Sequence, residues 1–128
     1  MLSEFGYVSI LIFVCMNALF VLALILKNNS IIDIFWGVGF IIIAATLALK
    51  IDLLSLTQII FGVLLSVWAL RLSLHIFLRN RGQSEDFRYA NWRRTWKYFV
   101  LRSYFQVFML QGLMMLLISL PLIAVFNN

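Results

Sequence analysis

The sequence has little of what a soluble domain needs. Charged residues make up 12% and hydrophobic residues 64% of its 128 residues, whereas soluble domains average about a quarter charged and about half apolar. The single cysteine, Cys15, lies inside an apolar run, so no disulfide within the chain is possible. His75 is the only histidine, and no metal-type Cys/His spacing exists, so we expect no metal site. The composition therefore indicates a membrane protein without metal or disulfide chemistry.

Four apolar runs fill most of the chain. A hydrocarbon core about 30 Å thick needs about 20 apolar residues per helical span, and the runs cover about 5–26, 31–49, 54–78 and 99–126. We expect an all-α fold, an integral membrane four-helix bundle, with residues 1–128 forming a single membrane domain. Glu4 is acidic where a signal peptide is basic, and the run after it is too long, so we interpret it as a retained first helix.

The basic residues are distributed unevenly between the loops. Nine of the ten Lys and Arg residues lie in or beside the turn at Lys27 and the loop at 79–97, and Lys50 alone lies on the other side. Because cytoplasmic loops carry the excess of Lys and Arg, we expect the long loop in the cytoplasm and both termini outside. The same rule explains the positive charge without nucleic-acid binding.

The long loop contains a helical pattern of its own. Between about 87 and 98, Tyr89, Trp92 and Trp96 recur at helical spacing, and basic residues lie on another face. A helix with an aromatic and a basic face is typical of the headgroup layer, with Asp86 as its expected N-cap. The pattern predicts a cytoplasmic interfacial helix, either a surface anchor alone or one that also binds an anionic ligand.

The third apolar run ends in a polar stripe. Arg71, His75 and Arg79 are spaced i, i+4, i+8 and so share a face, and Trp68 lies one turn earlier on that side. A charge inside a bilayer is costly, so we expect Arg71 to have a partner, whereas Arg79 is close enough to the end to extend to the interface. His75 has two interpretations, a hydrogen-bonded structural residue or part of a site.

Asp33 is the only acid well inside a predicted span. Ser30 and Asp33 fit an S-x-x-D capping box, which would explain the acid structurally. Capping is compatible with function, and we expect Asp33 to approach Arg71 or His75 across the helix interface. Gly37, on the same side as Asp33, would allow close helix approach.

The fourth run adds polar groups on the same side of the membrane. These are Arg102, Gln106 and, deeper, Gln111, which is placed to hydrogen-bond between helices. Together with the stripe on the third run they predict a pocket open to the cytoplasm.

A series of ordered motifs spans nearly the whole chain. They are DIFWG at 33–37, WALRLSLH at 68–75, RNRG at 79–82, EDFRY at 85–89, FQVF at 105–108 and SLP at 119–121. In this order they closely resemble the N-terminal half of a bacterial membrane family related to the steroid 5-alpha reductases.

The resemblance implies an NADPH-dependent reductase that reduces a carbon–carbon double bond in a lipid-like substrate. By that resemblance a first set of residues would bind substrate: Asp33, Trp36, Trp68, Arg71 and His75. A second set would lie near the cofactor: Arg81, Asp86, Arg88 and Tyr89. Arginine side chains near a cofactor are compatible with NADPH, because the planar guanidinium group binds phosphates with two hydrogen bonds.

Members of that family are about twice as long, and their second half carries most of the cofactor site. We therefore expect this chain to act, if at all, with a separate chain that supplies the missing helices. Two alternatives stay open: a truncated membrane protein without catalysis, and a small four-helix transporter acting as a homo-oligomer. The transporter has a weakness, because Asp33 lies at a helix end and transporter sites lie near the midplane.

Overall fold

The computed structural model describes residues 1–128 as an all-helical bundle, which confirms the predicted fold class. The helices are α1 (Leu2–Leu26), α2 (Ile31–Ala48), α3 (Leu56–Asn80), α4 (Phe87–Thr95), α5 (Phe99–Ser103), the π-helical segment η1 (Tyr104–Met109), α6 (Leu110–Ile118) and α7 (Leu120–Asn127). Four helical stretches are long and apolar enough to cross a membrane: Leu2–Leu26, Ile31–Ala48, Leu56–Asn80 and Phe99–Ile118.

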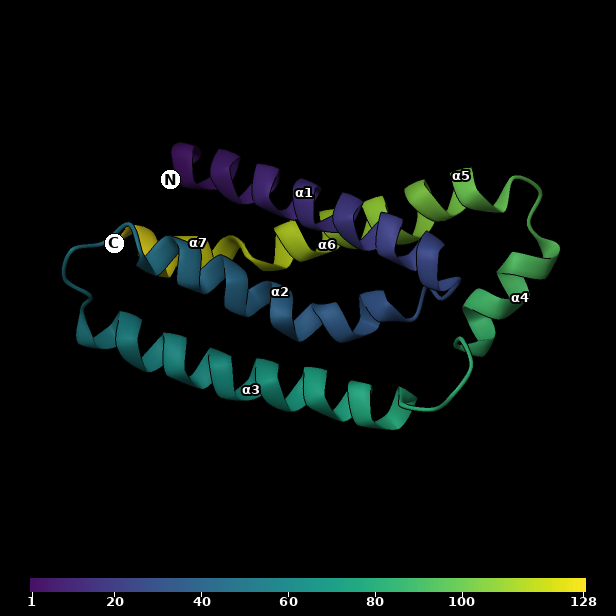
Figure 1. Ribbon diagram of the computed structural model, residues 1–128. Helices are drawn as coiled ribbons and strands as arrows, with labels where there is room; N and C mark the ends of the chain where they lie inside the picture. The colour runs from purple at the N-terminus through teal and green to yellow at the C-terminus, as the bar shows by residue number, and fades with distance from the viewer.

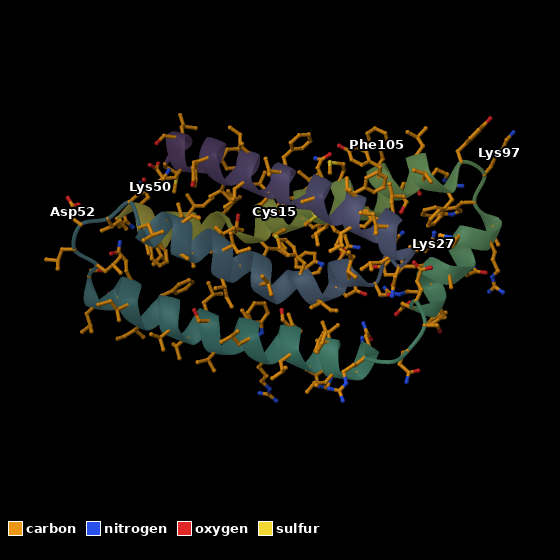
Figure 2. All side chains as sticks on the ribbon, in the orientation of Figure 1. Cys15, Lys27, Lys50, Asp52, Lys97 and Phe105 are labelled. Carbon is orange, nitrogen blue, oxygen red and sulfur yellow. The ribbon has the colours of Figure 1, made fainter.

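The bundle has two distinct ends. Helices α1, α2 and α3 run lengthwise side by side, α6 and α7 lie beside them, and α4 crosses one end (Figure 1). Both termini lie at the opposite end, where the N-terminal amine donates a hydrogen bond to Asn127 Oδ1 at 2.9 Å. Lys27 and Lys97 lie at the α4 end, and Lys50 lies at the end with the termini (Figure 2). The unequal charge of the loops is therefore an unequal charge of the two ends of the fold.

The fourth predicted span is not one continuous helix. Helix α6 ends at Ile118, and a new helix, α7, starts at Leu120. Pro121 explains the break, because it has no N–H to donate to the carbonyl four residues earlier. Ser119 is fully buried at the break and its hydroxyl donates to Leu116 O at 2.7 Å. Helix α7 then packs against α1, α2 and α3 and completes the core with Leu122, Ile123 and Phe126.

Helices α2 and α3 form the tightest pair in the bundle. A Cβ added at Gly37 would collide with Ala69 O and Ser73 Oγ, so only glycine permits this approach. The Ser73 hydroxyl donates to Ile34 O at 2.7 Å and accepts from Val38 N at 3.1 Å. It therefore bridges two groups that pair with each other in a regular α-helix. The predicted role of Gly37 in close helix approach is confirmed.

Two local predictions need correction. Ser30 makes no side-chain cap on α2, and the capping box of this fold lies instead at Ser55 and Gln58 before α3. The predicted loop helix ends at Thr95 rather than residue 98, and Trp96 is extended. Its N-cap is Asp86 as predicted, with Oδ1 accepting from Arg88 N at 2.9 Å. The position of α4 at a membrane surface stays a prediction.

Candidate functional site

The start of α2 and the segment leading into α4 are joined by buried polar contacts. Asp86 N donates to Ser30 Oγ at 2.7 Å, which explains why Ser30 does not cap its own helix. Asn29 N donates to Glu85 Oε2 at 2.6 Å, and the Asn29 amide donates to Ser103 Oγ at 2.6 Å. Arg93 holds Glu85 with two hydrogen bonds of 2.9 and 3.0 Å. These contacts fix α4 across the end of the bundle.

A chain of hydrogen bonds runs from the middle of the bundle to Asp33. Trp36 Nε1 donates to Gln111 Oε1 at 2.7 Å, Gln111 Nε2 donates to the Tyr89 hydroxyl at 3.3 Å, and Tyr89 donates to Asp33 Oδ1 at 3.1 Å. Arg88 approaches the other carboxylate oxygen at 3.6 Å. Three helices, α2, α4 and α6, thus contribute to one chain of donors that ends at the Asp33 carboxylate. We call Trp36, Gln111, Tyr89 and Asp33 the Asp33 network.

Burial and charge keep the Tyr89 hydroxyl protonated. Tyr89 is only 2% exposed, and burial, together with the neighbouring Asp33 charge, raises the pKa of Tyr89 to about 12. At neutral pH this group is therefore a hydrogen-bond donor and not a base. Outside the network, the hydrogen bond from Arg88 holds the pKa of Asp86 below its usual value.

The aromatic face of α4 packs on the protein. Tyr89, Trp92, Trp96 and Phe99 form a continuous row of ring contacts, with Trp92 and Trp96 stacked at 4.8 Å between centroids. Arg102 lies over the Trp96 ring at 4.4 Å. Trp92 and Trp96 are partly buried and pack against the hydrophobic core.

The predicted contact between Asp33 and Arg71 or His75 is wrong. Asp33 is bound to Tyr89 and Arg88, whereas Arg71 and His75 are exposed and make no hydrogen bond or ion pair. They line an open groove of about 310 Å³ on α3 with Trp68 and Leu72. The reason is that the Gly37–Ser73 contact turns a different face of α3 toward α2.

The predicted substrate residues thus divide between two places. Asp33 and Trp36 belong to the Asp33 network, while Trp68, Arg71 and His75 lie on α3. The two places are connected by aromatic contacts, since Phe40 lies 6.0 Å from both the Trp36 and the Trp68 ring centroids.

The predicted cofactor residues come together in part. Asp86, Arg88 and Tyr89 are neighbours at the start of α4, with an Arg88–Asp86 ion pair of 3.0 Å. Arg81 lies apart at the end of α3, exposed and without an ion pair. The positive charge of these arginines thus lies on the surface around the Asp33 network rather than inside it.

Sequence reasoning missed Asn29, Glu85 and Ser103 as site residues. Glu85 lies in the EDFRY motif together with Tyr89, and this shared motif is the sequence feature that could have identified Glu85 as a site residue. Asn29 and Ser103 looked like ordinary turn and helix residues, and nothing in the sequence indicated that they meet. Gln111 was expected to bond between helices, and this prediction is confirmed.

The fold and the site together define a four-helix membrane protein with a polar network closed by a crossing helix. The chain belongs to the DUF1295 family, whose model, described as a protein of unknown function, matches residues 19–128. This is a family of steroid 5-alpha reductase-like membrane proteins, so the predicted resemblance is confirmed. Comparison with curated proteins and with solved structures gives no match.

Proposed function

We propose that this chain is the N-terminal part of a membrane-embedded NADPH-dependent reductase of the steroid 5-alpha reductase type. It would reduce a carbon–carbon double bond in a lipid-like substrate together with helices from a separate chain. The observation that carries the proposal is the partly buried Tyr89–Asp33 hydrogen bond of 3.1 Å, formed between two of the motifs on which the resemblance rests.

The chemistry of such a reduction explains why this pair matters. When a double bond conjugated to a carbonyl is reduced, negative charge develops on the carbonyl oxygen, and a fixed hydrogen-bond donor stabilises it. Bound NADPH supplies the hydride. The Tyr89 hydroxyl, whose pKa of about 12 keeps its proton in place at neutral pH, would be the matching donor if its single proton turned from Asp33 to the substrate oxygen. In the structure that proton is donated to Asp33, which holds the hydroxyl in place.

The residues present fit one part of NADPH. Arg81 and Arg94 are exposed and free of ion pairs, and Arg88 is half-exposed, so guanidinium groups are available for the phosphates. The nicotinamide ring has no matching pocket, because the grooves on this chain are open and none encloses the Asp33 network. We therefore assign only phosphate binding and hydroxyl positioning to this chain, and infer that the partner chain supplies the remaining wall.

We propose further that the protein lies in the bacterial cytoplasmic membrane with the α4 end inside and both termini outside. Nine of ten Lys and Arg residues in or beside the loops of that end support this orientation. A dinucleotide from the cytoplasm would then meet the arginine-bearing end directly.

The proposal is tested by NADPH binding, measured as energy transfer from tryptophan to the reduced nicotinamide. The protein is purified alone and with each membrane protein encoded beside its gene. We expect binding only with the correct partner, and weaker binding in the variant Arg81→Gln/Arg88→Gln. Lys50→Gln, which removes one charge at the opposite end, is the matched control and should bind normally.

Two results would contradict this function. No binding with any neighbour would favour a non-catalytic membrane protein, and binding that Lys50→Gln weakens as much as the arginine variant would exclude the assigned phosphate site. The transporter alternative gains no support, because Asp33 lies in the first turn of α2 and is bound by Tyr89 and Arg88.

A further inference from the structure

One face of α3 carries polar side chains that the bundle does not use. Trp68, Arg71, Leu72 and His75 line an open groove of about 310 Å³. Arg71 and His75 are exposed, and neither makes a hydrogen bond or an ion pair within the chain. Any partner of this guanidinium must therefore come from outside the chain.

The depth of Arg71 makes such a partner necessary. Helix α3 has 25 residues, roughly 37 Å at 1.5 Å per residue, and so slightly exceeds a hydrocarbon core of about 30 Å. Arg71 precedes the last residue, Asn80, by nine positions, and so lies roughly 13 Å from the helix end. An arginine at this depth extends toward the headgroups and needs an anion there.

The rest of the same face is apolar. Trp68, Leu64 and Ile60 follow Arg71 at helical spacing toward the other end and are 49%, 65% and 50% exposed. The Trp68 ring is held against buried Phe40 at 6.0 Å between centroids. The face thus has the Arg71 guanidinium and the His75 ring at its headgroup end and an apolar stripe below them, which matches the headgroup and acyl chain of a lipid.

We propose that this face of α3 binds an anionic phospholipid of the cytoplasmic leaflet. The lipid phosphate accepts hydrogen bonds from the Arg71 fork and from the His75 ring, and an acyl chain lies along Trp68, Leu64 and Ile60. The cytoplasmic leaflet is the anionic one, and the long Arg71 side chain can extend to its phosphates. The proposal goes beyond the reductase function and does not depend on it.

The test uses tryptophan quenching by brominated lipids. The protein is placed in phosphatidylcholine nanodiscs that contain a small fraction of either brominated phosphatidylglycerol or brominated phosphatidylcholine. The signal of Trp68 is obtained by subtracting the variant Trp68→Phe. We expect brominated phosphatidylglycerol to quench Trp68 more strongly, and Arg71→Gln/His75→Gln to reduce this preference about fivefold, the effect of one basic residue near an anionic surface. Arg94→Gln, an equal charge change on α4, should keep the preference.

Four results would overturn the proposal. They are an unchanged preference in the double variant, an equal loss in Arg94→Gln, displacement of the lipid by inorganic phosphate, and no quenching of Trp68 by either lipid. The third would assign the groove to a soluble phosphate, and the fourth would mean that another protein covers this face. Arg71 and His75 make no hydrogen bond or ion pair within the bundle. Circular dichroism should therefore show unchanged helix content in the double variant.

Discussion

Replacing Tyr89 by Phe is the sharpest test of the Asp33 network. The change removes one oxygen and leaves the ring, which is 2% exposed and packs against Trp92 at 5.7 Å between centroids. The lost hydrogen bond to Asp33 has a charged acceptor, and such bonds contribute about 1.5–3 kcal/mol. The Gln111 contact is long at 3.3 Å, and the Asp33 side chain is 19% exposed and can gain water. We therefore expect a loss of about 2 kcal/mol in the free energy of unfolding.

The assay is equilibrium unfolding of the detergent-solubilised protein by increasing denaturing detergent, followed by tryptophan fluorescence. Tyr98→Phe is the matched control, because Tyr98 is 71% exposed and its hydroxyl makes no hydrogen bond. Asp33→Asn is then combined with Tyr89→Phe in a double-mutant cycle, and the double variant should lose less than the sum of the two single losses. If Tyr89→Phe behaves like Tyr98→Phe, or if the two losses add, the hydrogen bond contributes nothing and the network is not a unit.

Three further outcomes follow from the structure. In a spectroscopic titration of tyrosinate, one residue should ionise near pH 12, and Tyr89→Phe should remove this step. Because the pKa of this acid is raised from 10.0 in the folded protein, its contribution to stability is present below pH 10 and is lost between 10 and 12. Gly37→Ala should cost about 1–3 kcal/mol through overpacking against Ala69, whereas Gly6→Ala, which meets nothing within 4 Å, should not destabilise. A C-terminal reporter that is active only in the cytoplasm should be silent, and a strong signal would reverse the proposed orientation.

The helices themselves could be predicted because their cause is local. An apolar run of about 20 residues forms a helix in a membrane whatever surrounds it, since its backbone groups have no other partners. The cap at Asp86 and the glycine contact at Gly37 could be predicted for the same reason, as each depends on one residue type with a specific geometry. The break at Ser119 was missed because Pro121 lies in a run that hydropathy alone reads as continuous.

The partners of polar residues could not be predicted in the same way. Ser30 and Asp33 fit a capping pattern within their own helix, but both are bonded to residues more than 50 positions later, Asp86 and Tyr89. A local motif competes with every distant group that the fold brings close, and a buried phenol or an unpaired backbone N–H is a stronger competitor than water. Arg71 was assigned to Asp33 because both lie near the same end, yet rotation of α3 about its axis decides which face meets α2.

The Asp33 network also bears on where the function of this chain lies. Its residues come from separate motifs of the family resemblance, Asp33 and Trp36 from DIFWG and Tyr89 from EDFRY, and Ser30 and Glu85 beside them join the same two segments. Stability alone does not require a charged group here, because an apolar pair of similar size is often as stable as a buried charged one. A polar arrangement at the end that carries the arginines is therefore compatible with the proposed function. If the proposed reductase function is right, Asp33→Asn should lower the reductase activity of the chain with its partner more than it lowers stability. Activity should be normalised to the amount of folded protein to show this.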